Sequence, residues 1–317
     1  MKDKEIKKEL IREIEKISNL FIEKENKICK MTKFDEIIPS IYLEGVRNRE
    51  YKRAGELIIA ISQEYVEIII SIYFIDWWRN FGLSEDFSSY GTDFDYPIIF
   101  WNDLVKMIIV YFHTKMRSIL DYISRFLFEL VKLSINADRI AQILKPKRFK
   151  RFSSLFNWFT GAEGAKMIKN KQAKLVGQDI INLVKNGVWY KTIRTVRDSL
   201  LHPKISKPFD SIQTTRTVTF SGNQDGIYFE IITGFETLKD KLPIFLRGTG
   251  NLRKTIKFEL YAAYFLVKLY SFLEELAEIS QDRLNLSFLG NTLPQEGQIF
   301  SIILNWIKKL LHRLESN

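Results

Sequence analysis

Apolar residues recur at three- and four-residue steps along most of the chain, which is the spacing of one buried face of an α-helix. In the first such stretch, Ile6, Leu10 and Ile14 form a single stripe, whereas the isoleucines around Ile58 and Ile69 are dense enough to predict burial on most sides. The spacing predicts helices over residues 4–27, 46–80, 98–133, 175–201, 252–282 and 295–314. The chain is therefore predicted to be mainly α, a bundle of long antiparallel helices.

Interruptions of this pattern divide the chain into regions. Pro39 and Gly45 predict a connection between the first two helices, and Asn186-Gly187 predicts a break within the segment 175–201. The segment 81–97, with three Ser, two Gly and one Pro, is predicted to be a loop and the boundary of an N-terminal part. The predicted regions are an N-terminal helical region over 1–90, a helical domain over 91–285 and a C-terminal amphipathic helix over 286–317.

Two short stretches alternate with a period of two, which is the pattern of a β-strand. Residues 216–220 and 227–232 are rich in β-branched and aromatic side chains, and the polar segment 221–226 between them is typical of a hairpin turn. We therefore expect a small β hairpin near 211–234, inserted between helices. The helix over 295–314 could cap the core, mediate assembly or contact a membrane surface, and capping the core is the plainest of these interpretations.

Composition indicates a folded protein with a polyanionic partner. The 317 residues are 46% hydrophobic and include 24 Phe, 13 Tyr and 6 Trp, which is enough apolar surface for a large core. The formal net charge of +10, from 48 Lys and Arg against 38 Asp and Glu, favours nucleic acid or an anionic membrane surface. Charge alone does not choose between these two partners.

The sequence gives no signal for several other classes of protein. The apolar stretch 57–78 is interrupted by Glu64, Glu67 and Asp76, so no membrane span is predicted. Cys29 is the only cysteine, which leaves no internal disulfide and no Cys/His cluster with the spacing of a metal site. The charged N-terminal run is unlike a secretory signal, so a cytoplasmic location is expected. We also find no P-loop, dinucleotide-binding glycine fingerprint or nucleophile elbow.

The densest positive charge lies in the segment 145–174. It holds nine basic residues and one acidic residue, with Phe and Trp side chains interleaved among them. Basic side chains bind phosphates and aromatic rings stack on unpaired bases, so the mixture is typical of a surface for single-stranded RNA or DNA. The alternative is a solvated basic loop whose aromatic residues anchor it to the core. The candidate RNA-binding residues are Lys147, Arg148, Lys150 and Arg151.

The candidate for chemistry is the stretch Arg197-Asp198-Ser199-Leu200-Leu201-His202-Pro203, at the end of the predicted helix 175–201. Pro203 disfavours helical geometry at His202, so the imidazole is expected at a helix C-terminus. The partial negative charge of that terminus favours the imidazolium, the nearby arginine opposes it, and the sequence does not settle which effect is larger. An arginine that binds phosphate and a histidine that moves a proton are a sensible pair for a phosphodiester.

The spacing of this pair favours a site shared between two chains. Arg197 and His202 lie about 140° apart around an ideal helix, so one helix cannot easily direct both side chains at a single phosphate unless its end unwinds at Pro203. Two copies of the helix across a twofold axis remove this difficulty, and homodimers are the commonest symmetric assembly.

His113 is a second histidine on a predicted helix, and the residue four positions later is Arg117. No partner at metal-ligand spacing accompanies His113. Because the surrounding helix is mostly apolar, we interpret His113 as a histidine whose hydrogen bonds are satisfied within the protein, rather than as a ligand or a catalyst.

Taken together, Arg197, Asp198, His202 and Pro203, with the upstream helical run Arg117-Ser118-Ile119-Leu120-Asp121-Tyr122, resemble the HEPN superfamily. The signature of this superfamily is an arginine, a polar residue, three or so further residues and a histidine, often followed by proline. The resemblance covers the stretch from Ile98 to about Asp282 and does not account for the N-terminal helices or the β hairpin. It implies an HEPN-like helical bundle that forms a homodimer and so brings two motifs together.

The activity implied by the resemblance is that of a metal-independent endoribonuclease with no cofactor, cutting RNA at a composite site of the homodimer. His202 would move a proton at the 2′-hydroxyl or the leaving group, and Arg197 would hold the scissile phosphate. Asp198 would orient the motif. A carboxylate beside the phosphate should repel RNA unless Asp198 is engaged by Arg197 or by a backbone group.

Many members of the superfamily are toxins or antiphage effectors. The resemblance therefore implies a role in antiviral defence, with an antitoxin or a sensor protein as a partner that restrains or triggers the activity. The alternative is a non-catalytic HEPN-like binding module, which would bind RNA or act as the partner of a nucleotidyltransferase.

Overall fold

The structure is a computed structural model. It describes a few residues between 4 and 15, and then residues 33–82, 96–134, 146–162, 166, 176–201, 228–230, 242–247 and 255–284. These residues are mainly helical, as the apolar spacing predicts. The helices are α2 (Lys33–Arg47), α3 (Arg49–Gly82), α5 (Tyr96–Ser134), η1 (Pro146–Phe149), α7 (Phe152–Thr160), α10 (Gln178–Asn186), η2 (Gly187–Trp189), α11 (Tyr190–Leu201), η3 (Ile244–Leu246) and α13 (Phe258–Leu284). The two strands are β1 (Tyr228–Glu230) and β2 (Thr255–Lys257).

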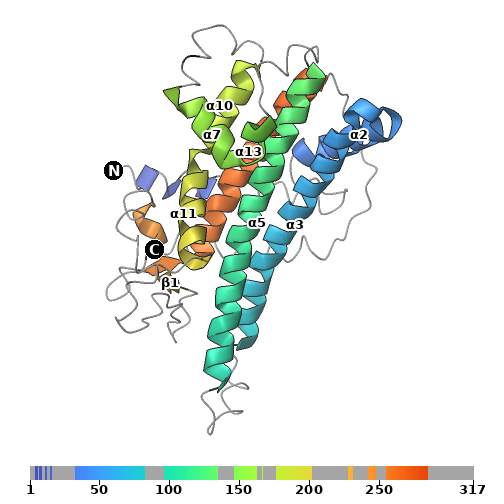
Figure 1. Ribbon diagram of the computed structural model, residues 1–317. Coiled ribbons are helices and arrows are strands. Elements are labelled where there is room, and N and C mark those ends of the chain that lie inside the picture. The colour runs from blue at the N-terminus through green and yellow to red at the C-terminus, as the bar shows by residue number, and fades with distance from the viewer. Residues whose placement is uncertain are drawn as a thin grey trace, which may run out of the picture.

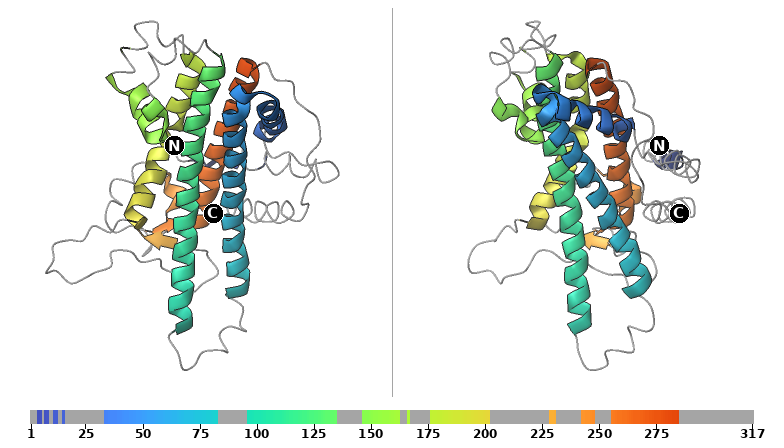
Figure 2. Two further views of the ribbon diagram at one scale, coloured as in Figure 1. Left: turned by 45° about the vertical axis from the view of Figure 1, so that its right-hand side comes forward. Right: turned by 90° about the vertical axis from the view of Figure 1, so that its right-hand side faces the viewer.

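Two long helices form the frame of the molecule. The chain runs along α3 and returns along α5, so these helices are antiparallel neighbours over much of their length (Figure 1). Helix α13 packs against α5 and α2, α11 packs against α5, and α10 packs against α7 and α13 (Figure 2). None of the described helices combines the length and the apolar character needed to cross a membrane.

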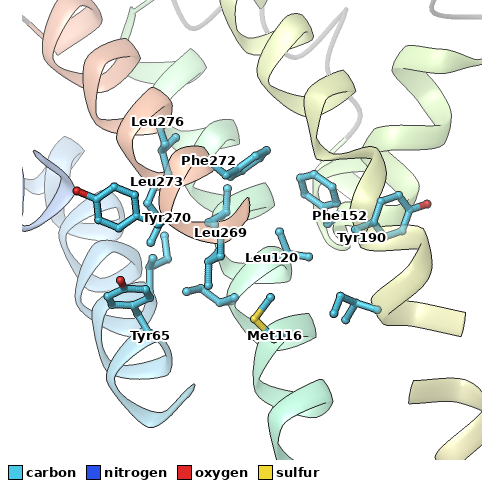
Figure 3. Close-up of a cluster of buried hydrophobic side chains, with 14 of the residues drawn as sticks. Tyr65, Met116, Leu120, Phe152, Tyr190, Leu269, Tyr270, Phe272, Leu273 and Leu276 are labelled. Atoms are coloured by element: carbon cyan, nitrogen blue, oxygen red, sulfur yellow. The ribbon is translucent and has the colours of Figure 1, made fainter. Parts of the chain in front are cut away.

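A single hydrophobic cluster joins these helices. Side chains from α3, α5, α7, α11 and α13 meet in it, among them Tyr65, Met116, Phe152, Tyr190 and Leu269 (Figure 3). Residues of α2 belong to the same cluster. Helices α2 and α3 therefore share a core with α5 and α13, although the predicted boundaries at residues 90 and 285 remain predictions.

Two predicted helical segments, 98–133 and 175–201, are found close to their predicted bounds. The predicted helix 98–133 corresponds to α5, and the segment 175–201 is interrupted at Gly187, where η2 separates α10 from α11. A Cβ atom at Gly187 would lie 2.6 Å from Cζ of Phe152, so this position requires glycine because α7 approaches it closely.

The predicted connection at Pro39 and Gly45 is wrong, because α2 remains helical through both residues. A proline inside a helix costs about 3 kcal/mol, but α2 buries the side chains of Ile37, Ile38 and Ile41 in the core, and this burial offsets the cost. The turn lies instead at Asn48, whose Oδ1 accepts the backbone N–H of Glu50 at 3.0 Å and so caps the start of α3.

The predicted start of the last described helix is also wrong. Residues 255–257 are not helical but form β2, which pairs antiparallel with β1 and places Phe229 opposite Ile256. Both side chains are fully buried. Packing on a buried pleated surface favours β-branched residues such as Ile256, so the segment just before α13 forms a strand.

The remaining predictions of secondary structure fall largely outside the described residues. Strand β1 lies within the predicted strand 227–232. The partner strand 216–220 and the turn 221–226 lie outside the described residues, as do the helix 295–314 and most of the helix 4–27. The inserted β hairpin therefore stays a prediction.

Candidate functional site

One face of α5 presents a row of polar side chains at three- and four-residue steps. Thr114, Arg117, Ser118, Asp121 and Arg125 all line the same pocket. Residues three or four positions apart lie on one side of a helix, so a single straight helix brings these groups together. This face is directed toward α11 and toward the start of α7, both of which pack against α5.

Side chains of α5 also hold the backbone of the basic segment. The hydroxyl of Ser124 donates to the carbonyl of Phe149 at 2.9 Å, and Oδ1 of Asp121 accepts the backbone N–H of Phe152 at 2.9 Å. Nε of Arg125 donates to the carbonyl of Lys150 at 3.5 Å. The side chain of the N-cap residue of α7, Arg151, makes no capping hydrogen bond, so Asp121 supplies the cap from another helix.

These contacts create a cationic pocket of about 380 Å³ between α5, α11 and the start of α7. Its lining contains five cationic side chains against one carboxylate, so it attracts anions. The lining residues are Thr114, Arg117, Ser118, Asp121, Arg125, Lys150, Arg151 and Arg197.

Arg197, the arginine of the candidate motif, is held in the wall of this pocket by its neighbour. Its Nη1 donates to Oδ1 of Asp198 at 2.9 Å, so the carboxylate is engaged by the arginine. Asp198 is also 3.4 Å from Nε of Arg194 and 3.9 Å from Nη1 of Arg117. Nε of Arg197 is buried without a hydrogen-bond partner among the described residues, which costs free energy because the donor has lost its contact with water.

His113 lies behind the pocket and is fully buried. Nδ1 is 2.7 Å from the carbonyl of Ile109, so Nδ1 carries the proton, and Nε2 accepts the hydroxyl of Tyr261 at 2.9 Å. Burial lowers the pKa of His113 to about 4, against the opposing effect of the Ile109 carbonyl, and the charge of Arg197 lowers it further. The interpretation of His113 as a satisfied histidine is confirmed.

The structure brings together only some of the predicted site residues. Lys150 and Arg151 share the pocket with Arg197, although more than 45 residues separate them from it along the chain. Lys147 is exposed but does not line the pocket, and the guanidinium of Arg148 stacks over the ring of Trp158 at 4.5 Å.

The predicted histidine falls outside the described residues. Helix α11 is described as far as Leu201, so the positions of His202 and Pro203, and the predicted end of the helix at Pro203, are not part of the described structure. Of the candidate catalytic residues, the structure therefore describes Arg197 and Asp198.

The aromatic residues of the basic segment belong to the core. They are almost completely buried, so they offer no exposed ring for a base, and this confirms that Phe149, Phe152, Phe156, Trp158 and Phe159 anchor the segment to the core. The expected solvated loop is wrong for the described part of the segment, which forms η1 and α7. Among its described basic residues, Lys147, Lys150, Arg151 and Lys166 are exposed.

The sequence interpretation missed Arg125 and did not assign Arg117 to a site. Both lie in the pocket, at positions eight residues apart on α5 with Asp121 midway between them. Three charged residues at four-residue steps on a mostly apolar helix form a polar stripe, and this stripe could have indicated the site from the sequence.

In the described part of the chain, no three His, Cys, Asp or Glu side chains are grouped so that they could hold a metal ion. Comparisons of the chain with protein-family models, with curated proteins and with solved structures found no match. The function of the chain must therefore be inferred from the geometry of the pocket and from the motif that contributes Arg197 to it.

Proposed function

We propose that this chain is a metal-independent endoribonuclease of HEPN type that acts in the cytoplasm, as a toxin or an antiphage effector. The observation that carries the proposal is the place of Arg197. The arginine of the motif lies in the wall of a cationic pocket, together with Arg117, Arg125, Lys150 and Arg151. Such a pocket suits the phosphates of RNA, which supply the negative charge that these side chains attract.

In the proposed reaction, the 2′-oxygen of a ribose attacks the adjacent phosphorus and the bond to the 5′-oxygen of the next nucleotide breaks. The proton of the 2′-hydroxyl is removed, a proton is delivered to the departing 5′-oxygen, and a 2′,3′-cyclic phosphate remains. Arg197 would hold the phosphate and stabilise the charge that develops on it. His202 would transfer a proton at one of the two oxygens, and Asp198 holds Arg197 in place for this role.

The proposal places the complete site across a homodimer. Helix α11 is regular from Tyr190 to Leu201, which supports the argument that Arg197 and His202 diverge around one helix. An arginine from one protomer and a histidine from its partner would then act on the same phosphate. An antitoxin or a sensor protein would be the partner that controls the activity.

A second candidate function is a non-catalytic HEPN-like module that binds RNA or accompanies a nucleotidyltransferase. The observation that favours it is the composition of the pocket, whose five cationic side chains are groups that bind phosphate rather than transfer protons near neutral pH. The two functions share the pocket and differ in the role of His202.

The test is cleavage of a fluorescently labelled single-stranded RNA in the presence of a chelator. Wild-type protein is expected to cut it, and Arg197→Ala and His202→Ala are each expected to abolish cutting while circular dichroism shows an unchanged fold. Arg49→Ala, which removes an exposed arginine on α3 away from the pocket, serves as the matched control.

The outcomes separate the candidate functions. Binding of RNA by the wild type without cleavage supports the module, and full activity in either variant refutes the assignment of the site. For the shared site, mixing the two inactive variants is expected to restore part of the activity, because a mixed dimer contains one site with both groups intact. Full activity in a monomer contradicts the shared site alone.

A further inference from the structure

The pocket contains groups that recognise charge and few that recognise a base. Besides the five cationic side chains and Asp121, the described lining comprises the hydroxyl residues Thr114 and Ser118, with no aromatic or aliphatic side chain. Proteins that read unpaired bases commonly stack them on aromatic rings. The five aromatic residues closest in sequence to Lys150 and Arg151 are buried in the core and cannot do this.

The cationic groups are also too many and too widely spread for one phosphodiester. Five cations against Asp121 in the lining and Asp198, which is paired with Arg197 and Arg117, leave an excess of three positive charges, whereas a phosphodiester carries a single negative charge. Arg117 and Arg125 are eight residues apart on α5, so their Cα atoms are separated by about 12 Å along the helix axis. The volume of about 380 Å³ is correspondingly larger than one phosphate group requires.

Three of the five cationic groups, those of Arg117, Arg125 and Arg197, are held in position by contacts within the protein. Arg125 donates to the carbonyl of Lys150 at 3.5 Å, and Arg197 donates to Asp198 at 2.9 Å. Nε of Arg117 lies 3.9 Å from Oδ2 of Asp121. Because the guanidinium groups are anchored before a ligand arrives, less side-chain entropy is lost when it binds.

We propose that this pocket holds two neighbouring phosphates of an RNA backbone and reads no base, so that the chain binds RNA without sequence preference at this subsite. One phosphate lies against Arg197 and Arg117, and its neighbour lies against Arg125, Lys150 and Arg151. The two-phosphate subsite rests on the proposed ribonuclease function, because it describes the substrate features of that same site.

The experiment measures binding of uncleavable 2′-O-methyl hexanucleotides by fluorescence anisotropy. Hexauridylate and hexaadenylate are expected to bind with dissociation constants within about threefold of each other, a difference of less than 1 kcal/mol. Unlabelled tripolyphosphate is expected to displace both hexanucleotides, and at a concentration at least about tenfold lower than orthophosphate, because only tripolyphosphate presents linked phosphate groups.

Two variants and a control assign these effects to the pocket. Lys150→Glu and Arg125→Gln are expected to weaken binding of both hexanucleotides and of tripolyphosphate by about tenfold. Lys52→Glu changes an exposed lysine on α3 that does not line the pocket, and it is expected to leave all three affinities within about twofold. Lys150 is itself exposed, so its substitution does not threaten folding.

A preference above tenfold for adenylate or uridylate would overturn the inference, since it would show that a base is read. Tripolyphosphate that binds while neither hexanucleotide does would also overturn it, because the pocket would then serve a free oligophosphate. Cleavage is measured separately on unmodified RNA. Base-independent binding without cleavage contradicts the proposed ribonuclease, whereas base-selective binding with intact cleavage contradicts only this subsite.

Discussion

Arg197 and Asp198 show how one motif reconciles a phosphate-binding arginine with an adjacent acid. Asp198 forms ion pairs with Arg197, Arg194 and Arg117. Its negative charge therefore holds guanidinium groups in place and is balanced by them, so it repels a ligand less. Asp121 acts similarly toward Arg117 on the other side. The two carboxylates reduce the repulsion among the cations in the free protein, and a bound phosphate would reduce it further.

His113 provides a prediction about stability and pH. Its pKa is about 4 in the folded protein and near 6.5 when unfolded, so the unfolded state binds more protons between these values. The stabilising effect of the neutral histidine is therefore complete above pH 6.5 and is lost as the pH falls toward 4. We expect the free energy of unfolding to fall by about 3 kcal/mol over this interval, as measured by urea denaturation.

The control for this pH dependence is the double variant His113→Leu/Tyr261→Phe. It removes the titrating ring together with the hydroxyl that donates to it, so no donor is left unpaired. Its unfolding free energy should change less steeply than that of the wild type between pH 6.5 and 4. Equal slopes for the two proteins would show that His113 does not control acid stability.

Among the helices, α7 depends on a cap supplied by α5. Asp121→Ala removes the acceptor for the N–H of Phe152 and should destabilise the first turn of α7 by about 1 kcal/mol. Hydrogen exchange of a peptide covering residues 149–160 is expected to be faster in this variant. Asp121→Asn keeps a side-chain oxygen that can accept the same hydrogen bond, so its exchange should stay close to that of the wild type.

Protection of this peptide that is unchanged in the Asp121→Ala variant would contradict a capping role. The comparison of the two variants also separates the cap from the charge, since both remove the carboxylate from the pocket and only one removes the acceptor.

Elements with a strong local pattern could be predicted from the sequence, and those determined by distant partners could not. The regular spacing of apolar residues predicts α5, and Asn186-Gly187 predicts the break between α10 and α11. Helix α2 continues through Pro39 because three isoleucines are buried against other helices, which no local signal shows. Strand β2 forms because β1, about 25 residues earlier in the chain, pairs with it.

The same distinction applies to the candidate site. The motif led to Arg197, and the four-residue steps of Arg117, Asp121 and Arg125 were visible in the sequence. Their convergence with Lys150 was not, because it depends on contacts that the α5 side chains make with the backbone of the basic segment. The sequence pattern also could not distinguish rings that stack on bases from rings that fill the core.

At the scale of the whole molecule, the question is whether the overall charge or its position controls RNA binding. The net charge of +10 attracts any polyanion at long range, whereas Lys150 and Arg151 line the pocket directly. The double variants Lys150→Glu/Arg151→Glu and Arg49→Glu/Lys52→Glu lower the net charge by the same amount. All four of these residues are exposed, and the second pair does not line the pocket.

The measurement is the dependence of RNA affinity on salt concentration for a single-stranded oligonucleotide. Each phosphate contact contributes about 0.7 to the slope of log affinity against log salt, so the loss of two contacts should flatten the slope by about 1.4. We expect this change for Lys150→Glu/Arg151→Glu and a much smaller one for Arg49→Glu/Lys52→Glu. Equal slopes for the two double variants would mean that the molecule attracts RNA through its overall charge and that the pocket makes no direct phosphate contacts.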